Sequence, residues 1–335
     1  MEPLRILQLA TSTIGGAGIA ARRLHEALIE NEINSTLLTL SENVNPNGIY
    51  QIKRSHLNKK ASSLSTFLQS TFIQLSDQLL TPLSKNTFND HNIEIDKYQI
   101  IHIHAFYNLL STSGIIKLCQ NNPKKRFFVT LHDERFLSGG CHYSNGCVKI
   151  HNECRDCPQA TQFGKYFVHR EYREKLTKLG DLENLQLIAP SSWLHQLAGE
   201  NPATQGLKAH VVRNPVPNVF FDISHSKEDK DKEKLKIAFI SAHLNTRMKG
   251  LVTLISAMNL IAEKGYSDRF ELLFVGQGQV LGNLDPRIQF ETVITNSDIE
   301  TANALSHCEI LALPSIQDNL PSTCLLYTSP SPRDS

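Results

Sequence analysis

The chain has 335 residues, a length that predicts about two domains. Hydrophobic residues make up 40% and charged residues 20% of it, so the composition excludes a disordered or fibrous protein. The 34 Lys and Arg residues nearly cancel the 33 Asp and Glu residues, which leaves no overall field for binding nucleic acid. No apolar run reaches the ~18 residues that cross a bilayer, and no signal peptide is recognisable, which predicts a soluble, cytoplasmic protein.

Apolar runs alternate with helical patterns in the first half of the chain. A strand is expected over residues 4–10, a glycine loop over 15–18 and a helix over 20–29. Further strands are expected over 35–40, 99–104, 126–131 and 185–189. This alternation is typical of a doubly wound parallel sheet.

The alternation stops at residues 215–234, where two prolines precede a mixed-charge run that predicts a linker. It restarts with strands over 235–241, 270–275 and 309–313 and a helix over 251–263. The sequence therefore predicts two Rossmann-like domains, 1–214 and 235–323, with the second incomplete.

The tail over residues 324–335 has two Ser-Pro steps and no periodic pattern. It looks like translated sequencing-library adapter, so we expect a non-native tail on a truncated chain.

A glycine-rich segment follows the first strand. Gly16-x-Gly18-x-x-Ala21 matches the dinucleotide fingerprint in its Ala-ended form, and Glu42 near the end of the next strand is a candidate ribose acceptor. Glycines at a helix start let backbone N–H groups approach a phosphate. The segment predicts a phosphate site, with a ligand-free tight turn as the alternative.

His132 and Asp133 stand at the carboxyl end of the strand over 126–131, where α/β sheets bind ligands. A His beside an Asp can polarise a substrate hydroxyl near neutral pH. The alternative is that His132 only hydrogen-bonds a neighbouring loop.

Four of the seven cysteines follow within a short stretch: Cys141, Cys147, Cys154 and Cys157. Cys154-x-x-Cys157 is a good half-site for tetrahedral zinc, and the other two can complete it. The segment therefore predicts a structural zinc site, with free buried thiols or disulfides as alternatives.

Residues 51–76 combine Lys53, Arg54, Lys59 and Lys60 with apolar residues at helical spacing. Such an element can lie on an anionic membrane surface, which would place the protein at the inner face of the plasma membrane. Ordinary core packing with a solvated face is the alternative.

In the second half, Arg247 and Lys249 open a helix after a strand, where cations suit a bound anion better than the helix dipole. A solvated helix start is the alternative. The loop over 314–321, which contains Asp318, follows the last predicted strand.

In order, these segments resemble the retaining glycosyltransferases of family 4, which have the GT-B fold and include enzymes that build bacterial capsule, exopolysaccharide and lipopolysaccharide. The resemblance covers residues 1 to about 323. The matching residues are Gly15-Gly16-Ala17-Gly18, Thr130-Leu131-His132-Asp133, Gly139-Gly140-Cys141-His142-Tyr143 with Cys147, Cys154 and Cys157-Pro158-Gln159, Arg213-Asn214-Pro215, Lys249-Gly250, Val275-Gly276-x-Gly278, and Leu313-Pro314-Ser315 with Asp318-Asn319-Leu320-Pro321.

The resemblance implies that a nucleotide-diphosphate sugar binds between an acceptor-side first domain and a nucleotide-sugar-binding second domain. Its sugar would pass with retention to a saccharide or lipid-linked acceptor, and no cofactor would be required. The implied catalytic residues are His132, Asp133, Lys249 and Asp318, and the implied substrate-binding residues are Gly15, Gly16, Arg247, Gly276, Asn319 and Leu320. His132 would contact the donor sugar, Lys249, Arg247 and the glycine loop the diphosphate, and Asp318 the sugar hydroxyls.

The sequence departs from the family pattern in three places. Ala242-His243 stands where the family often has Gly-Arg, Asp318 replaces the first acid of its E-x7-E pattern, and Leu326 stands at the second. We therefore expect the chain to be inactive alone. Two alternatives are an NAD(P)-binding oxidoreductase that uses Gly16, Gly18 and Glu42, and a zinc-stabilised binding module over residues 139–158.

Overall fold

The computed structural model describes residues 3–42, 47–52, 71–73, 80–84, 93–222 and 234–320. The chain divides into two compact units, Met1–Pro215 and Val216–Ser335. Leu326, the tail over 324–335 and the basic residues of the 51–76 segment lie outside the described residues.

The described part of the first unit is built on a seven-stranded sheet in the order β3-β2-β1-β4-β5-β6-β7. Every neighbouring pair is parallel. The strands are β1 (Arg5–Ala10), β2 (Asn34–Thr39), β3 (Ile49–Gln51), β4 (Ile100–Ile103), β5 (Arg126–Thr130), β6 (Leu185–Ala189) and β7 (Lys208–Val211). The strand order reverses between β1 and β4, and such a switch point is where open α/β sheets bind ligands.

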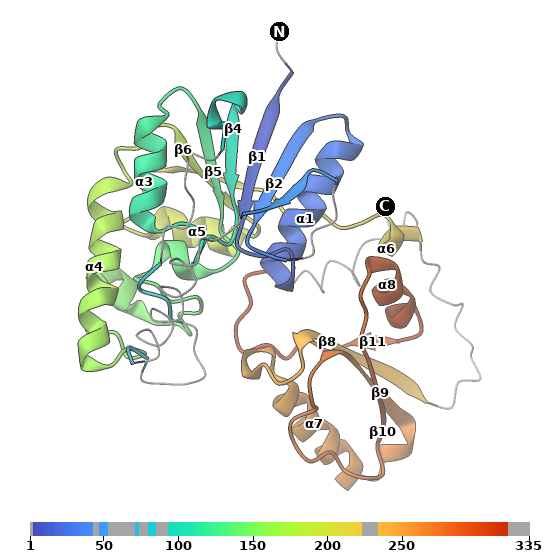
Figure 1. The fold of residues 1–335 in the computed structure, drawn as a ribbon. Coiled ribbons are helices and arrows are strands. Elements are labelled where there is room, and N and C mark those ends of the chain that lie inside the picture. Colours follow the sequence, from blue (N-terminus) through green and yellow to red (C-terminus); the bar gives the residue numbers. More distant parts are fainter. Residues whose placement is uncertain are drawn as a thin grey trace. The chain divides into compact units, whose positions relative to one another are not determined.

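Helices cover both faces of this sheet (Figure 1). They are α1 (Gly15–Glu30), α3 (Thr112–Asn121), α4 (Gln162–Lys178) and α5 (Ser192–Glu200), with 3-10 turns η2 (Ile95–Lys97), η3 (Glu134–Leu137) and η4 (Val148–Asn152). Alternate strand residues such as Leu9, Ile103 and Val129 join the main core with residues of α3, α4 and α5. The opposite face packs on α1, where Ala21 meets Leu37.

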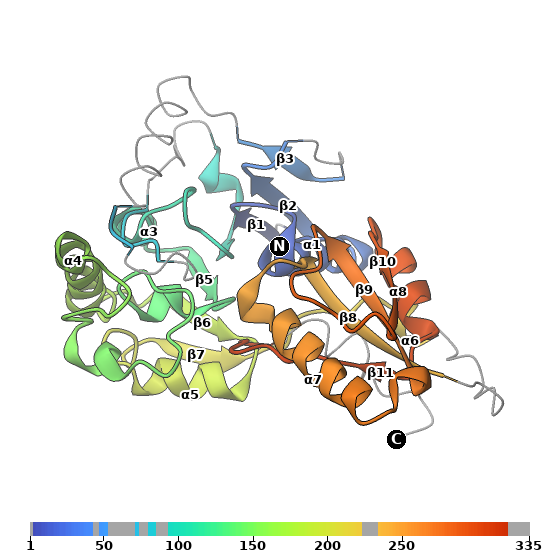
Figure 2. The ribbon, with the colours of Figure 1, turned by 90° about the horizontal axis from the view of Figure 1, so that it is seen from below.

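The second unit has a four-stranded parallel sheet over its described residues, in the order β10-β9-β8-β11 (Figure 2). Its elements are β8 (Leu235–His243), β9 (Phe270–Gln277), β10 (Gln289–Val293), β11 (Ile310–Leu311), α6 (Val219–Asp222), α7 (Leu251–Glu263), α8 (Asp298–Ser306), η5 (Arg247–Lys249) and η6 (Ser267–Arg269). One apolar cluster joins the sheet to α7, and a second joins its other face to α6 and α8. The order again reverses beside the first strand, between β8 and β11.

The predicted fold class is confirmed as α/β, with two Rossmann-like parallel sheets. The region expected as a linker includes α6, whose Phe220 is buried in the core of the second unit. None of the helices in the described ranges is long and apolar enough to span a membrane.

The helices differ in whether a side chain caps their N-terminus. Helices α3, α4, α5 and α8 each begin with a Ser or Thr whose hydroxyl accepts a first-turn N–H: Ser111, Thr161, Ser191 and Ser297. Helices α1 and α7 begin at Ile14 and Gly250, with no side-chain cap. These two helices follow the first strand of each sheet, so each switch point has a helix start with N–H groups that no capping side chain covers.

Candidate functional site

Three histidines gather at the carboxyl ends of β4 and β5. His104 Nδ1 lies 3.0 Å from His132 Nε2, and His102 Nε2 lies 2.7 Å from the hydroxyl oxygen of Thr130. His132 and His104 line both a small cavity of about 10 Å³ and a groove of about 240 Å³ beside α1. The groove is otherwise largely apolar, with Phe128 among its walls. The site can therefore enclose a small polar group against imidazole rings.

Burial keeps these rings neutral. It lowers the pKa of His102 to about 3, with a smaller contribution from the charge of His132. Burial likewise lowers the pKa of His132 to about 4, although Asp133 opposes the shift, and it lowers the pKa of His104 well below its ordinary value. At neutral pH each ring therefore carries one N–H donor and one lone-pair acceptor.

Asp133 is held inside the loop that follows β5. Its Oδ1 accepts the Arg135 N–H at 2.9 Å and caps η3, and its Oδ2 lies 2.6 Å from His142 Nδ1. His142 Nε2 in turn lies 2.9 Å from the Thr81 hydroxyl. Burial alone would raise the pKa of Asp133, but His142 and the Arg135 N–H lower it below its ordinary value. Both oxygens of this carboxylate thus anchor the loop that carries His132.

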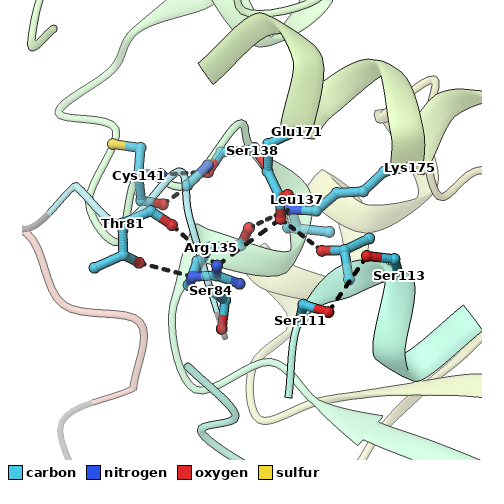
Figure 3. Close-up of polar contacts among 12 residues, drawn as sticks. Thr81, Ser84, Ser111, Ser113, Arg135, Leu137, Ser138, Cys141, Glu171 and Lys175 are labelled. Atoms are coloured by element: carbon cyan, nitrogen blue, oxygen red, sulfur yellow. Dashed lines mark hydrogen bonds and ion pairs between the residues drawn. The ribbon is translucent and has the colours of Figure 1, made fainter. Parts of the chain in front are cut away.

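A buried charged network lies beneath that loop (Figure 3). Arg135 donates from Nε and Nη2 to the hydroxyl and carbonyl of Thr81, at 2.7 and 2.9 Å. From α4, Lys175 Nζ donates to the carbonyls of Arg135 and Ser138 at 2.7 and 2.6 Å. Glu171 Oε1 lies 3.6 Å from Lys175 Nζ and 3.8 Å from Arg135 Nη2. The network fixes the backbone at Arg135 and Ser138 and ties it to Thr81.

Sequence reasoning missed Arg135 and Lys175. Both are fully buried, and Lys175 shares the buried face of α4 with Val168 and Tyr172. The available signal was a lysine at helical spacing from two core residues. A charged side chain on a buried helix face needs buried partners, so this position indicated a polar network.

The four cysteines do not form the expected zinc site. Across the ranges that the structure describes, which include all four thiols, no three His, Cys, Asp or Glu residues are placed to share a metal ion. Cys141 donates to the Tyr143 carbonyl at 2.7 Å and accepts from Gln159 Nε2 at 3.1 Å. Burial raises the pKa of the Cys154 thiol to about 11. None of the four thiols is joined to another in a disulfide.

The glycine loop at the start of α1 is open to a ligand. Gly15 has φ +74°, a left-handed conformation, and side chains added at Gly15 or Gly16 would meet nothing within 4 Å. A Cβ at Gly18 would lie 2.5 Å from the Ser12 carbonyl, so that glycine serves close packing between loop and helix. With no acidic residue in its first turn and no side-chain cap, the start of α1 suits an anion.

In the second unit, Lys249 and Asp318 meet across the switch point. Lys249 Nζ lies 2.5 Å from Asp318 Oδ2, and the two side chains are 31% and 17% exposed. The Ser315 hydroxyl also donates to Asp318, at 3.4 Å. The Ile316 N–H donates to the Met248 carbonyl at 2.9 Å, which joins the loop after β11 to η5. A cation and a carboxylate therefore stand together beside the uncapped start of α7.

The remaining predicted residues lie around this pair. Arg247 is exposed in η5, Asn319 is buried and Leu320 is half-buried. Gly276 ends β9 with φ +148°, and a Cβ there would lie 1.9 Å from the Ser241 carbonyl. Its observed role is the close approach of β9 to β8. The structure thus brings Lys249 and Asp318 together in one unit, and His132 and Asp133 in the other.

The comparisons with known proteins show that this chain resembles solved structures in its fold and in nothing else. No family model and no curated protein matches the sequence. The solved structure of WaaG, a glycosyltransferase involved in lipopolysaccharide biosynthesis, matches with TM-score 0.57 at 10% identity, covering 96% of this chain and 78% of that one.

Two further structures match similarly. A glycosyltransferase from Rickettsia africae has TM-score 0.54 at 13% identity, over 98% of this chain and 77% of that one. An α,α-trehalose-phosphate synthase from Burkholderia xenovorans has TM-score 0.56 at 12% identity, over 98% and 82%. The chain therefore has the GT-B-like architecture of these glycosyltransferases, two Rossmann-like units each built on a parallel sheet.

Proposed function

We propose that the protein is a retaining glycosyltransferase that moves a sugar from a nucleotide-diphosphate sugar to a saccharide or lipid-linked acceptor in cell-surface polysaccharide biosynthesis. The observation that carries the proposal is the pair of Lys249 and Asp318 beside the uncapped start of α7, in a chain with a GT-B-like fold. The likeness to WaaG, described as acting in lipopolysaccharide biosynthesis, supports the choice of pathway.

The charges at this switch point suit a diphosphate leaving group. Glycosyl transfer leaves negative charge on the diphosphate, and cations with oriented N–H donors stabilise that charge. Lys249, Arg247 and the first turn of α7 supply both kinds of group within one unit. Phosphate oxygens would replace Asp318 as the partner of Lys249, and the carboxylate, with the backbone of Asn319 and Leu320, would then accept hydrogen bonds from sugar hydroxyls.

The first unit has neutral groups that suit a sugar. His132 is neutral at physiological pH because its pKa is about 4, so it can hydrogen-bond a sugar hydroxyl without attracting a counter-ion. The open Gly15-Gly16 turn at the start of α1 offers further N–H donors to an anionic group. Asp133 holds the loop of His132 in place.

Titration of the full chain with UDP-glucose and GDP-mannose, followed by isothermal calorimetry, tests the proposal. A charge-assisted contact is worth about 1.5–3 kcal/mol, so Lys249→Ala should weaken binding roughly 10- to 100-fold. Lys264→Ala is the matched control, because Lys264 is an exposed lysine just beyond the other end of α7. Equal affinities for both variants would remove Lys249 from the site.

A second candidate is a nicotinamide-dependent oxidoreductase. It is favoured by the left-handed Gly15 turn, the close packing at Gly18 and the β3-β2-β1-β4 strand order, which dinucleotide-binding sheets share. Titration with NADH, followed by its fluorescence, separates the two candidates. Saturable NADH binding together with no nucleotide-sugar binding would favour the oxidoreductase.

A further inference from the structure

A line of polar side chains, most of them buried, connects His132 to His25 of α1. His104 Nε2 lies 2.9 Å from Gln8 Oε1, and Gln8 Nε2 donates to the Ser35 hydroxyl oxygen at 2.9 Å. Ser35 Oγ lies 2.9 Å from His25 Nδ1, and His25 Nε2 lies 2.7 Å from the Asn47 carbonyl oxygen. With the His132–His104 contact, these bonds form one chain from β5 through β4, β1 and β2 to α1.

The line is enclosed and closely fitted. Gln8, His25 and His104 are each at most 2% exposed, and Ser35 is 7% exposed. At its far end, Gly48 has φ +75°, and a Cβ there would lie 3.0 Å from Cε1 of His25. Only glycine lets the backbone carry the Asn47 carbonyl up to this ring. The Leu37 N–H donates to the Gly48 carbonyl and fixes the turn on β2.

Along this line every hydrogen bond is donated in the same direction, from the His104 end toward the Asn47 carbonyl. The Asn47 carbonyl can only accept, so His25 Nε2 is the donor of that pair, and the Ser35 hydroxyl, whose oxygen accepts from Gln8 Nε2, donates to His25 Nδ1. The Ser35 oxygen accepts from Gln8 Nε2, which leaves Gln8 Oε1 to accept from His104 Nε2.

The same logic extends to His132. Once His104 donates from Nε2, its Nδ1 is the acceptor and must take the proton of His132 Nε2. His132 is then the Nε2–H tautomer, and Nδ1 is the nitrogen of that ring that accepts a hydrogen bond. The low pKa of His132 and of His104 agrees with neutral rings at these positions.

We propose that Ser35 and His25 are positioning residues that fix the tautomer of His132 through Gln8 and His104, so that Nδ1 is the ring nitrogen of His132 that can accept a hydrogen bond. The relay concerns residues that the sequence patterns did not single out, on β1, β2 and α1. It stands without the proposed reaction, and it gives that reaction a group that takes a hydrogen bond from a substrate hydroxyl.

Nitrogen NMR of the full chain, labelled with ¹⁵N-histidine and free of ligand, tests the relay. Long-range proton–nitrogen correlations distinguish Nε2–H from Nδ1–H imidazole, and each ring is assigned by the signal lost in its His→Gln variant. In the unaltered protein we expect His25, His104 and His132 all to be Nε2–H. An Nδ1–H tautomer at His132 would overturn the proposal.

Ser35→Ala breaks the line at its centre. The ratio of the two His132 tautomers should shift about fivefold toward Nδ1–H, the factor that one net hydrogen bond is worth. Gln8→Met breaks the same line and serves if Ser35→Ala does not fold. An unchanged ratio in a folded variant would contradict the relay.

Thr130→Val is the matched control. It removes a buried hydroxyl that contacts His102 at 2.7 Å on the same sheet face but outside the line, so the His132 ratio should stay at the value of the unaltered protein. A shift equal to that of Ser35→Ala would show a general disturbance and refute the proposal. Because no nucleotide sugar is present, failure of the proposed function would leave these outcomes unaltered.

Discussion

The two units share one topology at their switch points, but the side chains there are neutral in the first unit and charged in the second. In both, the strand order reverses beside the first strand, and the helix that follows this strand starts without a side-chain cap. In the first unit the neighbouring side chains are His104, which is buried, and His132, which is half-buried, and both are neutral. In the second they are Lys249 and Asp318, a charged pair that keeps partial contact with water.

The difference shows what the topology fixes and what side chains add. Uncapped N–H groups at the start of a helix favour any anion. Neutral imidazoles add recognition of hydroxyl groups, whereas a half-exposed lysine adds charge for a phosphate at a modest desolvation cost. The side chains of the first unit therefore suit hydroxyl groups, and Lys249 in the second suits a phosphate, as the proposed function requires.

The largest expected difference between the two units is in the folding stability that each loses at acidic pH. The pKa of His102 is about 3 and that of His132 about 4 in the folded protein, against 6.5 when unfolded, and that of His104 is also low. The unfolded chain therefore binds more protons, and stability that is full above pH 6.5 is lost as the pH falls toward 4. At ~1.4 kcal/mol per pH unit for each ring, the first unit should lose on the order of 5 kcal/mol between pH 7 and pH 5.

Urea unfolding followed by tryptophan fluorescence measures this loss, because Trp193, the one tryptophan of the chain, belongs to the first unit. His102→Gln should reduce the pH dependence by about one third, since one of three rings no longer titrates. A Trp193→Phe, Phe270→Trp variant moves the fluorescent side chain to the second unit, so its unfolding can be followed in the same way. The pKa of its half-buried Asp285 is lowered to about 2 by Arg287, so the stability that this carboxylate adds is lost only as the pH falls below about 4. If both tryptophans reported the same loss of unfolding free energy between pH 7 and pH 5, the two units would not differ in acid stability.

The charged network beneath His132 should give the next largest effect. Lys175→Met removes both hydrogen bonds to the Arg135 and Ser138 carbonyls and leaves them buried without that donor. Breaking a buried charged contact costs about 3 kcal/mol, so the Trp193 transition should move to lower urea. Burial lowers the pKa of Lys175 to about 8, so the lysine is still charged at pH 7.

Lys178→Met is the control for this variant. Lys178 lies one turn further along α4, is 52% exposed and pairs with Glu174 at 3.1 Å. Exposed pairs of this kind contribute ~0.5 kcal/mol. If both variants lost the same stability, the network would not hold the His132 loop.

Patterns along the chain predicted the parts of the fold that long apolar runs define. The strands at Leu185–Ala189 and Arg126–Thr130 and the helix at Leu251–Glu263 were located almost to the residue, because each combines clear periodicity with turn signals. Strands β3, β7 and β10 were missed. They are short and largely exposed, so their sequences lack the apolar run that marks a buried strand.

The site shows the same division. His132 and Lys249 could be picked out because each follows a predicted strand of a parallel sheet. The relay through Gln8, Ser35 and His25 could not, because its hydrogen-bonded neighbours are up to 96 positions apart, as Gln8 and His104 are, and meet only through sheet order and the packing of α1. Zinc was inferred from cysteine spacing, but spacing does not fix where thiols point, and the Cys141 thiol donates to the Tyr143 carbonyl within the loop.

The smallest expected contrast concerns two glycines at matching positions. Gly15 begins α1 with φ +74° and Gly250 precedes α7 with φ +78°. A Cβ at Gly15 would meet nothing within 4 Å, whereas one at Gly250 would lie 1.9 Å from the Pro314 carbonyl oxygen. Gly15→Ala should therefore cost ~1 kcal/mol of backbone strain in the first unit, and Gly250→Ala about 2 kcal/mol in the second. Because Pro314 leads the loop to Asp318, Gly250→Ala should also weaken nucleotide-sugar binding. Equal stability losses in urea unfolding would mean that the loop after β11 yields freely, and Lys249 and Asp318 would then not be held together as the diphosphate site requires.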